Sequence, residues 1–406
     1  MRILLINRKH FIDGGADRVY LNTGKLLEDN GHNVAYFSTV NDKNLYTDYN
    51  KYFIDNIKPR QGTLLSKIQT VKKYLYNDEV FVKLKKLIKD FKPDVAHIHL
   101  FYGALSSSIL YTLKDNRIPI VITIHDYRLL CPVNSMLDKQ GHICEKCIND
   151  RFYNCIVKRC SEGNIFQSTV VTAEAYMRKF LVDPLKYIDH FIFVSQFSKD
   201  KHISFNNRYK EKSSHLYNFS DSFENPKVIK GDYLFYYGRL SKEKGVLNLI
   251  NSVKKTNSKL IIAGDGPQRE LVLNEIRGFS NIEYVGFQSG AELNDLIVKS
   301  SFIVVPSEWY ENNPMTIVES FFLGKPVIGS NIGGIPELLT NNTGFIFESA
   351  NELSLCNVIQ LSEIMTKEEY EMVSHNCINF AMEHFNKTNH LKELIEIYKK
   401  VKDESE

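Results

Sequence analysis

The sequence predicts an α/β protein with two Rossmann-like, doubly wound lobes and a cleft between them. The chain is 406 residues long, which is more than one hydrophobic core usually organises. Short β-rich apolar segments alternate with helical segments along the chain. One polar stretch interrupts this alternation, so we expect two parallel sheets, each covered by helices.

The first lobe is predicted to span residues 1–220. Helical periodicity at 17–29 and 80–91 separates some of its strands, and the first of these helices ends at Asn30-Gly31, a common C-terminal signal. Strands separated by helices form parallel sheets, because the chain must cross back before the next strand. The expected strands are 2–6, 34–38, 95–100, 118–124 and 191–195.

The second lobe is predicted to span residues 221–387, after a polar linker at 218–231. A final segment, 388–406, contains a helical pattern at 390–401 that we expect to pack back toward the first lobe. The expected strands of the second lobe are 234–237, 260–263, 282–285, 302–305, 327–329 and 344–347.

Composition narrows the class of protein. Hydrophobic residues make up 43% of the chain and charged residues 24%, as in ordinary soluble proteins. No apolar run reaches the ~18 residues that a membrane-spanning helix needs. The apolar start, residues 2–6, is too short for a secretory signal. We therefore expect a cytoplasmic protein.

Charge is distributed unevenly along the chain. Residues 1–220 contain 33 Lys and Arg against 22 Asp and Glu, a net charge of +11, whereas residues 221–406 contain 18 against 26, a net charge of −8. A basic first lobe suits an anionic surface or substrate, and scattered solvated lysines are the alternative. Among anionic partners we expect a membrane surface or a phosphorylated lipid rather than nucleic acid.

The strongest local signal follows the strand at 234–237. Arg239 and Lys244 lie on the turn between that strand and an amphipathic helix that starts at Val246. A guanidinium binds phosphate oxygens in pairs, and an ammonium adds a point charge. The turn therefore predicts a diphosphate site, with two solvated surface charges as the alternative.

A second anion-binding element follows the strand at 302–305. Pro314 suits the first position of a helix with Asn313 as its N-cap, which leaves the N–H groups of Met315 and Thr316 free to face an anion. Glu311 precedes this helix and Glu319 lies on it. Two carboxylates with this spacing can each accept hydrogen bonds from a pair of sugar hydroxyls.

These motifs resemble the retaining glycosyltransferases of family 4. The resemblance rests on Arg-x4-Lys at Arg239 and Lys244, on Glu-x7-Glu at Glu311 and Glu319, and on the segments 264–267, 284–287 and 329–337. It implies the GT-B architecture, a nucleoside-diphosphate sugar as donor and retention of anomeric configuration. Cationic side chains and a helix dipole can take the place of a metal, so we expect none in catalysis. Asn312 and Asn313 replace glycines that this family often has, which leaves the donor sugar open.

The resemblance also implies the role of each donor residue. Arg239 and Lys244 neutralise the leaving diphosphate, Glu311 binds the sugar's C3 and C4 hydroxyls, and Glu319 binds the ribose. The nucleotide base lies against the backbone near Gly286 and Phe287. The remaining predicted donor contacts are Gly264, Asn313, Pro314, Met315 and Thr316.

The first lobe carries a glycine loop and an edge histidine. Gly14 and Gly15 precede a helix and allow close approach of a phosphate or sugar, or simply form a tight loop. His125 ends a strand, where the resemblance places it beside the transferred sugar as a catalytic residue. His97 and His99 end the preceding strand, and we expect one of them to line the cleft.

Five cysteines crowd into the insertion 131–160 of the first lobe. Cys144-x2-Cys147 has the spacing of a zinc knuckle, and Cys131 and Cys160 could complete four thiolates. The expectation is a structural zinc, with reduced thiols packed in a small subdomain as the alternative. Cys155 is the spare cysteine.

Basic segments with apolar residues at 67–92 and 173–187 predict contact with an anionic membrane surface. The alternative is a lobe-packing helix with a solvated lysine face. If the contact exists, the protein is peripheral on the inner face of the plasma membrane. The acceptor is then a lipid-linked saccharide of surface-polysaccharide assembly.

Three other classes of protein fit the sequence less well. A dehydrogenase needs Gly-x-Gly-x-x-Gly after its first strand, which this chain lacks. A sugar-nucleotide epimerase shares the two-lobe fold and is the alternative to transfer. A non-catalytic sugar-binding protein would not need Arg239 or Glu311. Asp-x-Asp, which holds a metal in another glycosyltransferase architecture, is absent from the sequence.

Overall fold

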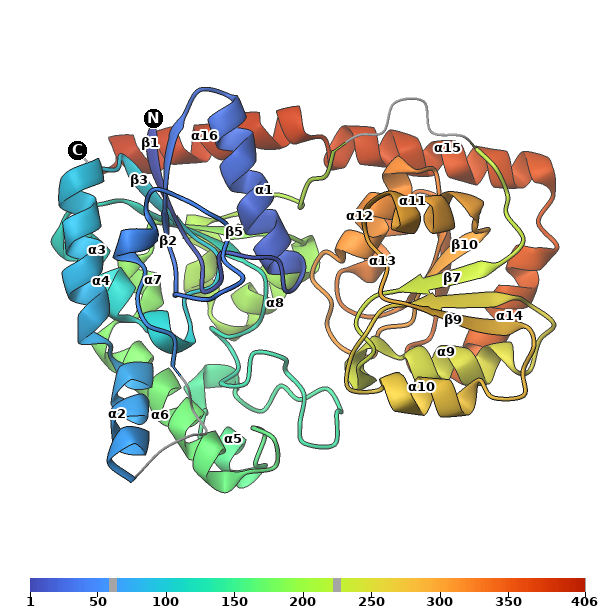
Figure 1. The fold of residues 1–406 in the computed structure, drawn as a ribbon, viewed down its shortest axis with the longest axis horizontal. Coiled ribbons are helices and arrows are strands. Elements are labelled where there is room, and N and C mark those ends of the chain that lie inside the picture. Colours follow the sequence, from blue (N-terminus) through green and yellow to red (C-terminus); the bar gives the residue numbers. More distant parts are fainter. Residues whose placement is uncertain (58–63, 222–227, 406) are drawn as a thin grey trace. The chain divides into compact units, whose positions relative to one another are not determined.

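A computed structural model describes residues 1–57, 64–221 and 228–405. The chain divides into two compact units, each with one six-stranded sheet in which all paired named strands run parallel (Figure 1). This confirms the predicted fold class. The first unit comprises Met1–Val194, Ser198–Leu216 and Thr388–Glu406, and the second comprises Ser195–Phe197 and Tyr217–Lys387.

The sheet of the first unit has the strand order β2-β1-β3-β4-β5-β6. The direction of strand addition reverses beside β1, so the switch point of this sheet lies between β1 and β3. The short edge strand β6 was not expected, since its Ser-Ser-His sequence has no β-branched or aliphatic residue. The strands are β1 (Arg2–Ile6), β2 (Asn33–Phe37), β3 (Val95–Ile98), β4 (Ile120–Ile124), β5 (His190–Phe193) and β6 (Ser213–His215).

Helices cover both faces of the first sheet. On one face, Leu5 of β1 packs with Leu27 of α1 (Gly15–Asp29) and with Tyr398 of α16 (Lys387–Asp403). On the other face, the ring of Phe193 lies 4.8 Å from that of His202 in α8 (Gln196–Phe205). The C-terminal helix therefore completes the core of the first unit.

The sheet of the second unit has the strand order β12-β11-β10-β7-β8-β9. Counted along the chain from the first strand of this unit, this is 3-2-1-4-5-6 read from the other edge, the Rossmann order. The switch point falls between β7 and β10. The strands are β7 (Leu234–Tyr237), β8 (Leu260–Ala263), β9 (Ile282–Gly286), β10 (Phe302–Val305), β11 (Val327–Ser330) and β12 (Gly344–Phe347).

The second sheet is also buried on both faces. Leu234 and Tyr236 of β7 pack on the side of α9 (Val246–Val253) and α14 (Glu352–Glu363). Phe235 packs on the side of α12 (Met315–Phe322) and α13 (Ile335–Leu338). Figure 1 shows α9 and α10 on one side of this sheet and α11 and α12 on the other. Burial on both faces explains why these strands are continuous apolar runs rather than alternating ones.

The remaining helices connect and cover the strands, and no helix within the described ranges is long and apolar enough to cross a membrane. Those of the first unit are α2 (Leu64–Leu75), α3 (Asp78–Phe91), α4 (Ser108–Asp115), α5 (Asn154–Val157), α6 (Ile165–Leu181) and α7 (Pro184–Tyr187). Those of the second are α9 (Val246–Val253), α10 (Arg269–Glu275), α11 (Gly290–Lys299), α12 (Met315–Phe322), α13 (Ile335–Leu338), α14 (Glu352–Glu363) and α15 (Lys367–His384).

Candidate functional site

Two loops meet at the switch point of the second unit, one after β7 and one after β10. Gly245 ends the β7 loop with φ 69°, and a Cβ there would lie 1.9 Å from the carbonyl oxygen of Pro306. The backbone N–H of Glu308 also donates to the carbonyl of Glu243 at 2.8 Å. The two loops are therefore in backbone contact, and only glycine fits at the crossing.

This contact brings Lys244 and Glu311 together. Lys244 Nζ lies 2.6 Å from Glu311 Oε1, and the Ser307 hydroxyl donates to the same oxygen at 2.7 Å. The Glu311 side chain is 8% exposed and that of Lys244 is 27% exposed. Lys244 Nζ also lies 5.2 Å from the centroid of the Trp309 ring. The Lys244 ammonium is therefore open to a ligand from solvent, whereas the Glu311 carboxylate lies buried behind it.

The Glu311 carboxylate is ionised at neutral pH. Burial raises its pKa, but the charge of Lys244 and the hydrogen bonds from Lys244 and Ser307 outweigh burial and hold the pKa below its ordinary value. An ionised carboxylate only accepts hydrogen bonds, so a further ligand here must be a donor such as a sugar hydroxyl.

Arg239 lies on the same loop as Lys244 but has a different environment. Its side chain is exposed, and no carboxylate in the described part of the chain pairs with it. Its turn is held by the loop after β8, because Leu240 N–H donates to the carbonyl of Asp265 at 2.9 Å. Arg239, with no carboxylate partner among the described residues, therefore leaves cationic capacity for an anion on the loop that also carries Lys244.

The loops after β8 and β9 continue this edge of the sheet. Gly264 N–H donates to the carbonyl of Gly286 at 2.8 Å, which ties the end of β8 to the end of β9. Phe287, the next residue, is 73% exposed. The predicted base-binding segment therefore presents backbone and an open aromatic ring at the strand ends.

The start of α12 differs from the prediction by one residue. The helix begins at Met315, with Pro314 extended (φ −66°, ψ 119°) as the N-cap residue. Asn313 does not cap it, because its Oδ1 accepts the backbone N–H of Asn218 at 3.0 Å instead. Thr316 is half-buried in the first turn, and Glu319 is half-buried further along the helix.

Gly333 and Gly334 lie against the backbone of Glu311. A Cβ on Gly333, at φ 62°, would lie 2.4 Å from the carbonyl oxygen of Glu311, and Gly334 N–H donates to that oxygen at 2.7 Å. The sequence indicated these glycines only as part of a family motif, and gave no sign that they contact the backbone of Glu311. Their small size lets the loop after β11 clamp the backbone of Glu311.

In the first unit, Gly14 is the N-cap residue of α1 and Gly15 its first residue, and nothing lies within 4 Å of a Cβ built on Gly14. The buried Asn7 was missed by sequence reasoning. Its amide donates to Asp17 Oδ1 of α1 at 2.9 Å, and its oxygen accepts from Leu100 N–H at 3.1 Å. Asn7 thus ties the end of β1 to α1 and to the residues after β3.

His125 belongs to a buried histidine cluster. His99 Nδ1 lies 2.9 Å from His125 Nε2, and His97 Nδ1 lies 2.6 Å from the hydroxyl of Tyr398 on α16. Burial lowers the pKa of His125 and of His97 to about 3. Both rings are therefore neutral at neutral pH, and His99 fixes the orientation of His125. The sequence offered no sign that Tyr398 joins this cluster.

The cysteine segment contains reduced thiols. Cys160 donates its S–H to Cys155, which lowers the pKa of Cys155 to about 7. Over the described ranges, no three His, Cys, Asp or Glu side chains are arranged to hold one metal ion. Zinc at Cys131, Cys144, Cys147 and Cys160 therefore stays a prediction, and Cys155, the predicted spare, pairs with a member of that set.

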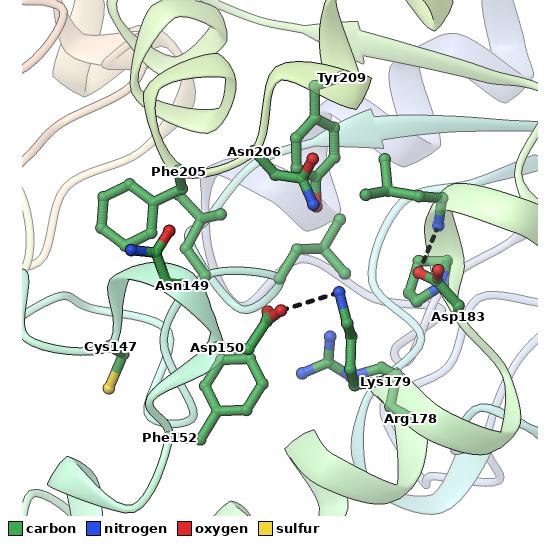
Figure 2. Close-up of a pocket in the computed structure, with 14 residues that line it drawn as sticks. Cys147, Asn149, Asp150, Phe152, Arg178, Lys179, Asp183, Phe205, Asn206 and Tyr209 are labelled. Atoms are coloured by element: carbon green, nitrogen blue, oxygen red, sulfur yellow. Dashed lines mark hydrogen bonds and ion pairs between the residues drawn. The ribbon is translucent and has the colours of Figure 1, made fainter.

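A small cavity borders this segment (Figure 2). It encloses about 30 Å3, room for one or two water molecules, between the cysteine segment, the end of α6 and the end of α8. Asp150 and Lys179 form an ion pair in it, with 2.9 Å between Oδ2 and Nζ. None of the predicted donor residues lines it.

The fold and the second-unit site define a GT-B glycosyltransferase. The family model described as Glycosyltransferase Family 4 matches residues 13–222, and the model described as Glycosyl transferases group 1 matches residues 219–379. The first match covers just over half of the chain, so the chain belongs to the glycosyltransferases that these models describe. The predicted resemblance to glycosyltransferases is confirmed at this level.

Known proteins agree with this assignment. An uncharacterized 42.6 kDa protein in the cps region of Klebsiella pneumoniae is 27% identical over 83% of this chain and 87% of its own length. A putative teichuronic acid biosynthesis glycosyltransferase of Bacillus subtilis is 24% identical over 34% of this chain and 33% of its own length. The Anabaena HepE structure with UDP and glucose superposes with a TM-score of 0.66 at 16% identity and covers 98% of both chains.

Proposed function

We propose that the chain is a retaining hexosyltransferase of family 4. It transfers a sugar from a nucleoside diphosphate to a hydroxyl of a lipid-linked saccharide in bacterial surface-polysaccharide assembly. The observation that carries the proposal is the pair Lys244–Glu311, 2.6 Å apart at the switch point of a Rossmann sheet, with Arg239 unpaired among the described residues beside it. The two cations suit the diphosphate of a sugar nucleotide, and the carboxylate suits the hydroxyls of its sugar.

The relatives support the substrate class. The Anabaena neighbour was crystallised with UDP and glucose, which favours a nucleoside-diphosphate sugar as donor. The Klebsiella relative lies in a cps region and the Bacillus relative is named for teichuronic acid biosynthesis. Both names favour a surface polysaccharide as the product. No comparison favours the epimerase alternative.

In this proposal the donor lies along the edge formed by the loops of the second unit. The diphosphate takes the charges of Arg239 and Lys244, and the sugar hydroxyls donate to Glu311. Glu319 binds the ribose, and the base lies against the backbone of Gly264 and Gly286 and the ring of Phe287. The start of α12, at Asn313, Pro314, Met315 and Thr316, faces the sugar and diphosphate with its free N–H groups.

The first unit serves the acceptor side. As the family resemblance implies, we assign Gly14 and Gly15 to binding of the phosphates and the acceptor, and neutral His125 to the transferred sugar. Because His125 is uncharged, it can orient the sugar by hydrogen bonding but supplies no positive charge to the diphosphate.

The chemistry needs positioning and anion stabilisation. The bond between the sugar C1 and the diphosphate oxygen breaks, the acceptor oxygen bonds to C1 on the same face, and the acceptor proton passes to the leaving phosphate oxygen. Arg239 and Lys244 stabilise the charge that develops on the diphosphate, the work of a divalent ion in other transferases. We therefore expect activity in the presence of a chelator.

The test starts with a panel of nucleoside diphosphates and their sugars, scored by thermal stabilisation of the full chain. The donor selected is incubated with saccharide acceptors in EDTA, and the product's anomeric configuration is determined by NMR. We expect a new glycoside with the donor's configuration, lost in Glu311→Gln and kept in Glu371→Gln, a surface control. An isomerised sugar nucleotide without glycoside would overturn transfer, and an inverted product would overturn retention.

A further inference from the structure

Helix α6 (Ile165–Leu181) buries several polar residues and exposes large apolar residues at both ends. Ser168, Thr172, Glu174 and Arg178 are among its buried residues. At its two ends, Phe166 is 65% exposed and Phe180 is 77% exposed, with Ile165 and Leu181 at 55% and 65%. This is the reverse of a surface helix in a soluble protein, where the apolar stripe faces the core.

The outward arc of α6 contains no charged residue. At the helical period, the residues that follow Phe166 on this side are Val170, Ala173, Met177 and Phe180, with Thr169 and Leu181 at its margins. The middle positions are half-buried and both ends are exposed. An apolar stripe of 17 residues' length therefore faces outward within the described part of the first unit.

A buried ion network holds α6 in this orientation. Glu174 accepts from Arg178 Nε at 2.9 Å and from Arg128 Nη2 at 3.1 Å, and Arg178 Nη2 donates to the carbonyl of Arg128 at 3.1 Å. Lys179 pairs with Asp150, and Figure 2 shows Arg178 and Lys179 both directed into the small cavity. Turning the stripe inward would break this network, so the exposure of the stripe is built into the fold.

The helix α5 extends the apolar surface. It packs against α6, where Tyr153 N–H donates to the hydroxyl of Tyr176, and Tyr176 stacks on Phe180 with 6.1 Å between the ring centroids. Tyr153 is 50% exposed and Val157 is 75% exposed. We call the exposed residues Tyr153, Val157, Ile165, Phe166, Phe180 and Leu181 the hairpin surface.

Cations border the hairpin surface in the chain. Lys146, Arg151, Arg159 and Lys186 are exposed, and within the described residues none of them pairs with a carboxylate. The exposed apolar and aromatic residues suit the acyl boundary of an anionic bilayer, and the flanking cations suit its phosphate headgroups. The same stretch of chain also carries exposed Asp150, which pairs with Lys179, and exposed Glu162. With four cations against these two carboxylates the border is basic on balance, which favours an anionic partner.

We infer that the hairpin surface binds the interface of a membrane that contains anionic lipid, with its apolar residues inserted and these four cations at the headgroups. Sequence reasoning placed the contact on a basic face that included Arg178. The structure instead buries Arg178 and turns the apolar side of α6 outward. This inference does not depend on the proposed sugar transfer, since it uses none of the donor-site residues.

The test is co-sedimentation of the full chain with phosphatidylcholine vesicles, with or without about one third phosphatidylglycerol. We expect binding only with phosphatidylglycerol, and weaker binding at about 0.5 M salt. Replacing Phe166 and Phe180 by Ser should lower the partition coefficient at least tenfold. Arg151→Glu with Lys186→Glu should lower it at least tenfold as well, since each cation near the surface contributes about fivefold.

Matched controls replace equally exposed residues elsewhere. Leu353 and Ile364, 70% and 78% exposed, lie in the second unit, and their double Ser variant should bind vesicles like the unchanged chain. As an independent probe, Phe180→Trp should show a blue shift of emission with anionic vesicles, and Ile364→Trp should not. Circular dichroism and light scattering confirm that each variant is folded and report its oligomeric state.

Three results would overturn the inference. The chain could fail to bind anionic vesicles, or the folded Phe166→Ser, Phe180→Ser variant could bind them as well as before. The chain could also form a dimer that this variant dissociates, with no vesicle binding, and the surface would then be covered by a second copy. Because no readout uses turnover, an inactive donor site cannot mimic any of these results.

Discussion

Lys244 and Glu311 form an ion pair of 2.6 Å although they lie in different loops, one after β7 and the other after β10. The pair places an ammonium and a carboxylate together at the switch point of the second sheet. Lys244 is only partly buried and also lies over the Trp309 ring. A diphosphate must therefore share or replace Glu311 as the partner of Lys244.

Trp309 should report donor binding directly. It is the only tryptophan of the chain, and its ring centroid lies 5.2 Å from Lys244 Nζ. When a nucleoside diphosphate draws the ammonium toward its phosphates, the cation–π contact changes, so tryptophan emission should change saturably with nucleotide concentration. Fluorescence titration measures this. The nucleoside alone should give no signal, and an unchanged response in Lys244→Ala would contradict the assignment.

Removing either cation should impair turnover. For Lys244→Ala and for Arg239→Ala we expect kcat/KM to fall by a factor equivalent to about 2–4 kcal/mol, as when one anion-stabilising donor is removed. Steady-state kinetics with the donor found in the panel measures the effect.

Lys259→Ala is the matched control for these variants, because its ammonium is exposed and pairs with Asp232 away from the strand ends that carry the donor loops. It should leave kcat/KM within about twofold. Near-unchanged turnover in both Arg239→Ala and Lys244→Ala would remove the diphosphate assignment.

Much of this site could be predicted because parallel sheets place all strand carboxyl ends at one edge. The strands 234–237 and 302–305 were expected with the bounds that the structure has, so Arg239, Lys244 and Glu311 were placed after the correct strands. Hydrophobic runs bounded by turns carry this information locally. Proximity of the two loops then follows from the switch point alone.

Side-chain partners could not be predicted in the same way. Nothing local in the sequence pairs Asn313 with Asn218, and that contact moves the start of α12. The orientation of α6 could not be predicted from the local sequence either. A helical period shows that the two faces of a helix differ, but it does not show which face is buried. There, the network around Glu174 decides the orientation.

Gly245→Ala should destabilise the second unit more than a positive φ alone explains. An added Cβ would lie 1.9 Å from the carbonyl oxygen of Pro306, and φ is 69°. At Gly278, φ is 86° and nothing lies within 4 Å of the added Cβ, so Gly278→Ala is the matched control. We expect the free energy of unfolding to fall by about 1 kcal/mol in the control and by about 3 kcal/mol in Gly245→Ala.

Urea unfolding followed by Trp309 emission measures this difference, since Trp309 lies in the second unit. In Gly245→Ala the loops separate, so the saturable nucleotide response should also weaken. Equal stability loss in the two variants would show that the loops are not held together at this crossing.

Acid should unfold the first unit before the second. Burial lowers the pKa of six histidines of the first unit: to about 3 for His97 and His125, to about 4 for His10, His190 and His202, and well below its ordinary value for His99. In the unfolded chain their pKa is about 6.5, so the unfolded state binds more protons below that pH. Their contribution to stability is complete above about pH 6.5 and is lost as the pH falls toward 3–4.

Each such histidine should lower the free energy of unfolding by about 2 kcal/mol between pH 7 and pH 5. The first unit should therefore lose several kcal/mol of stability over this range. The second unit has His375 at its surface and His384 half-exposed, and it should lose little. Hydrogen exchange of peptides from the two units, corrected for intrinsic exchange rates, measures the difference. Protection should fall in the first unit at pH 5 while that of the second persists. Equal losses in both units would show that the buried histidines do not set the acid limit of the fold.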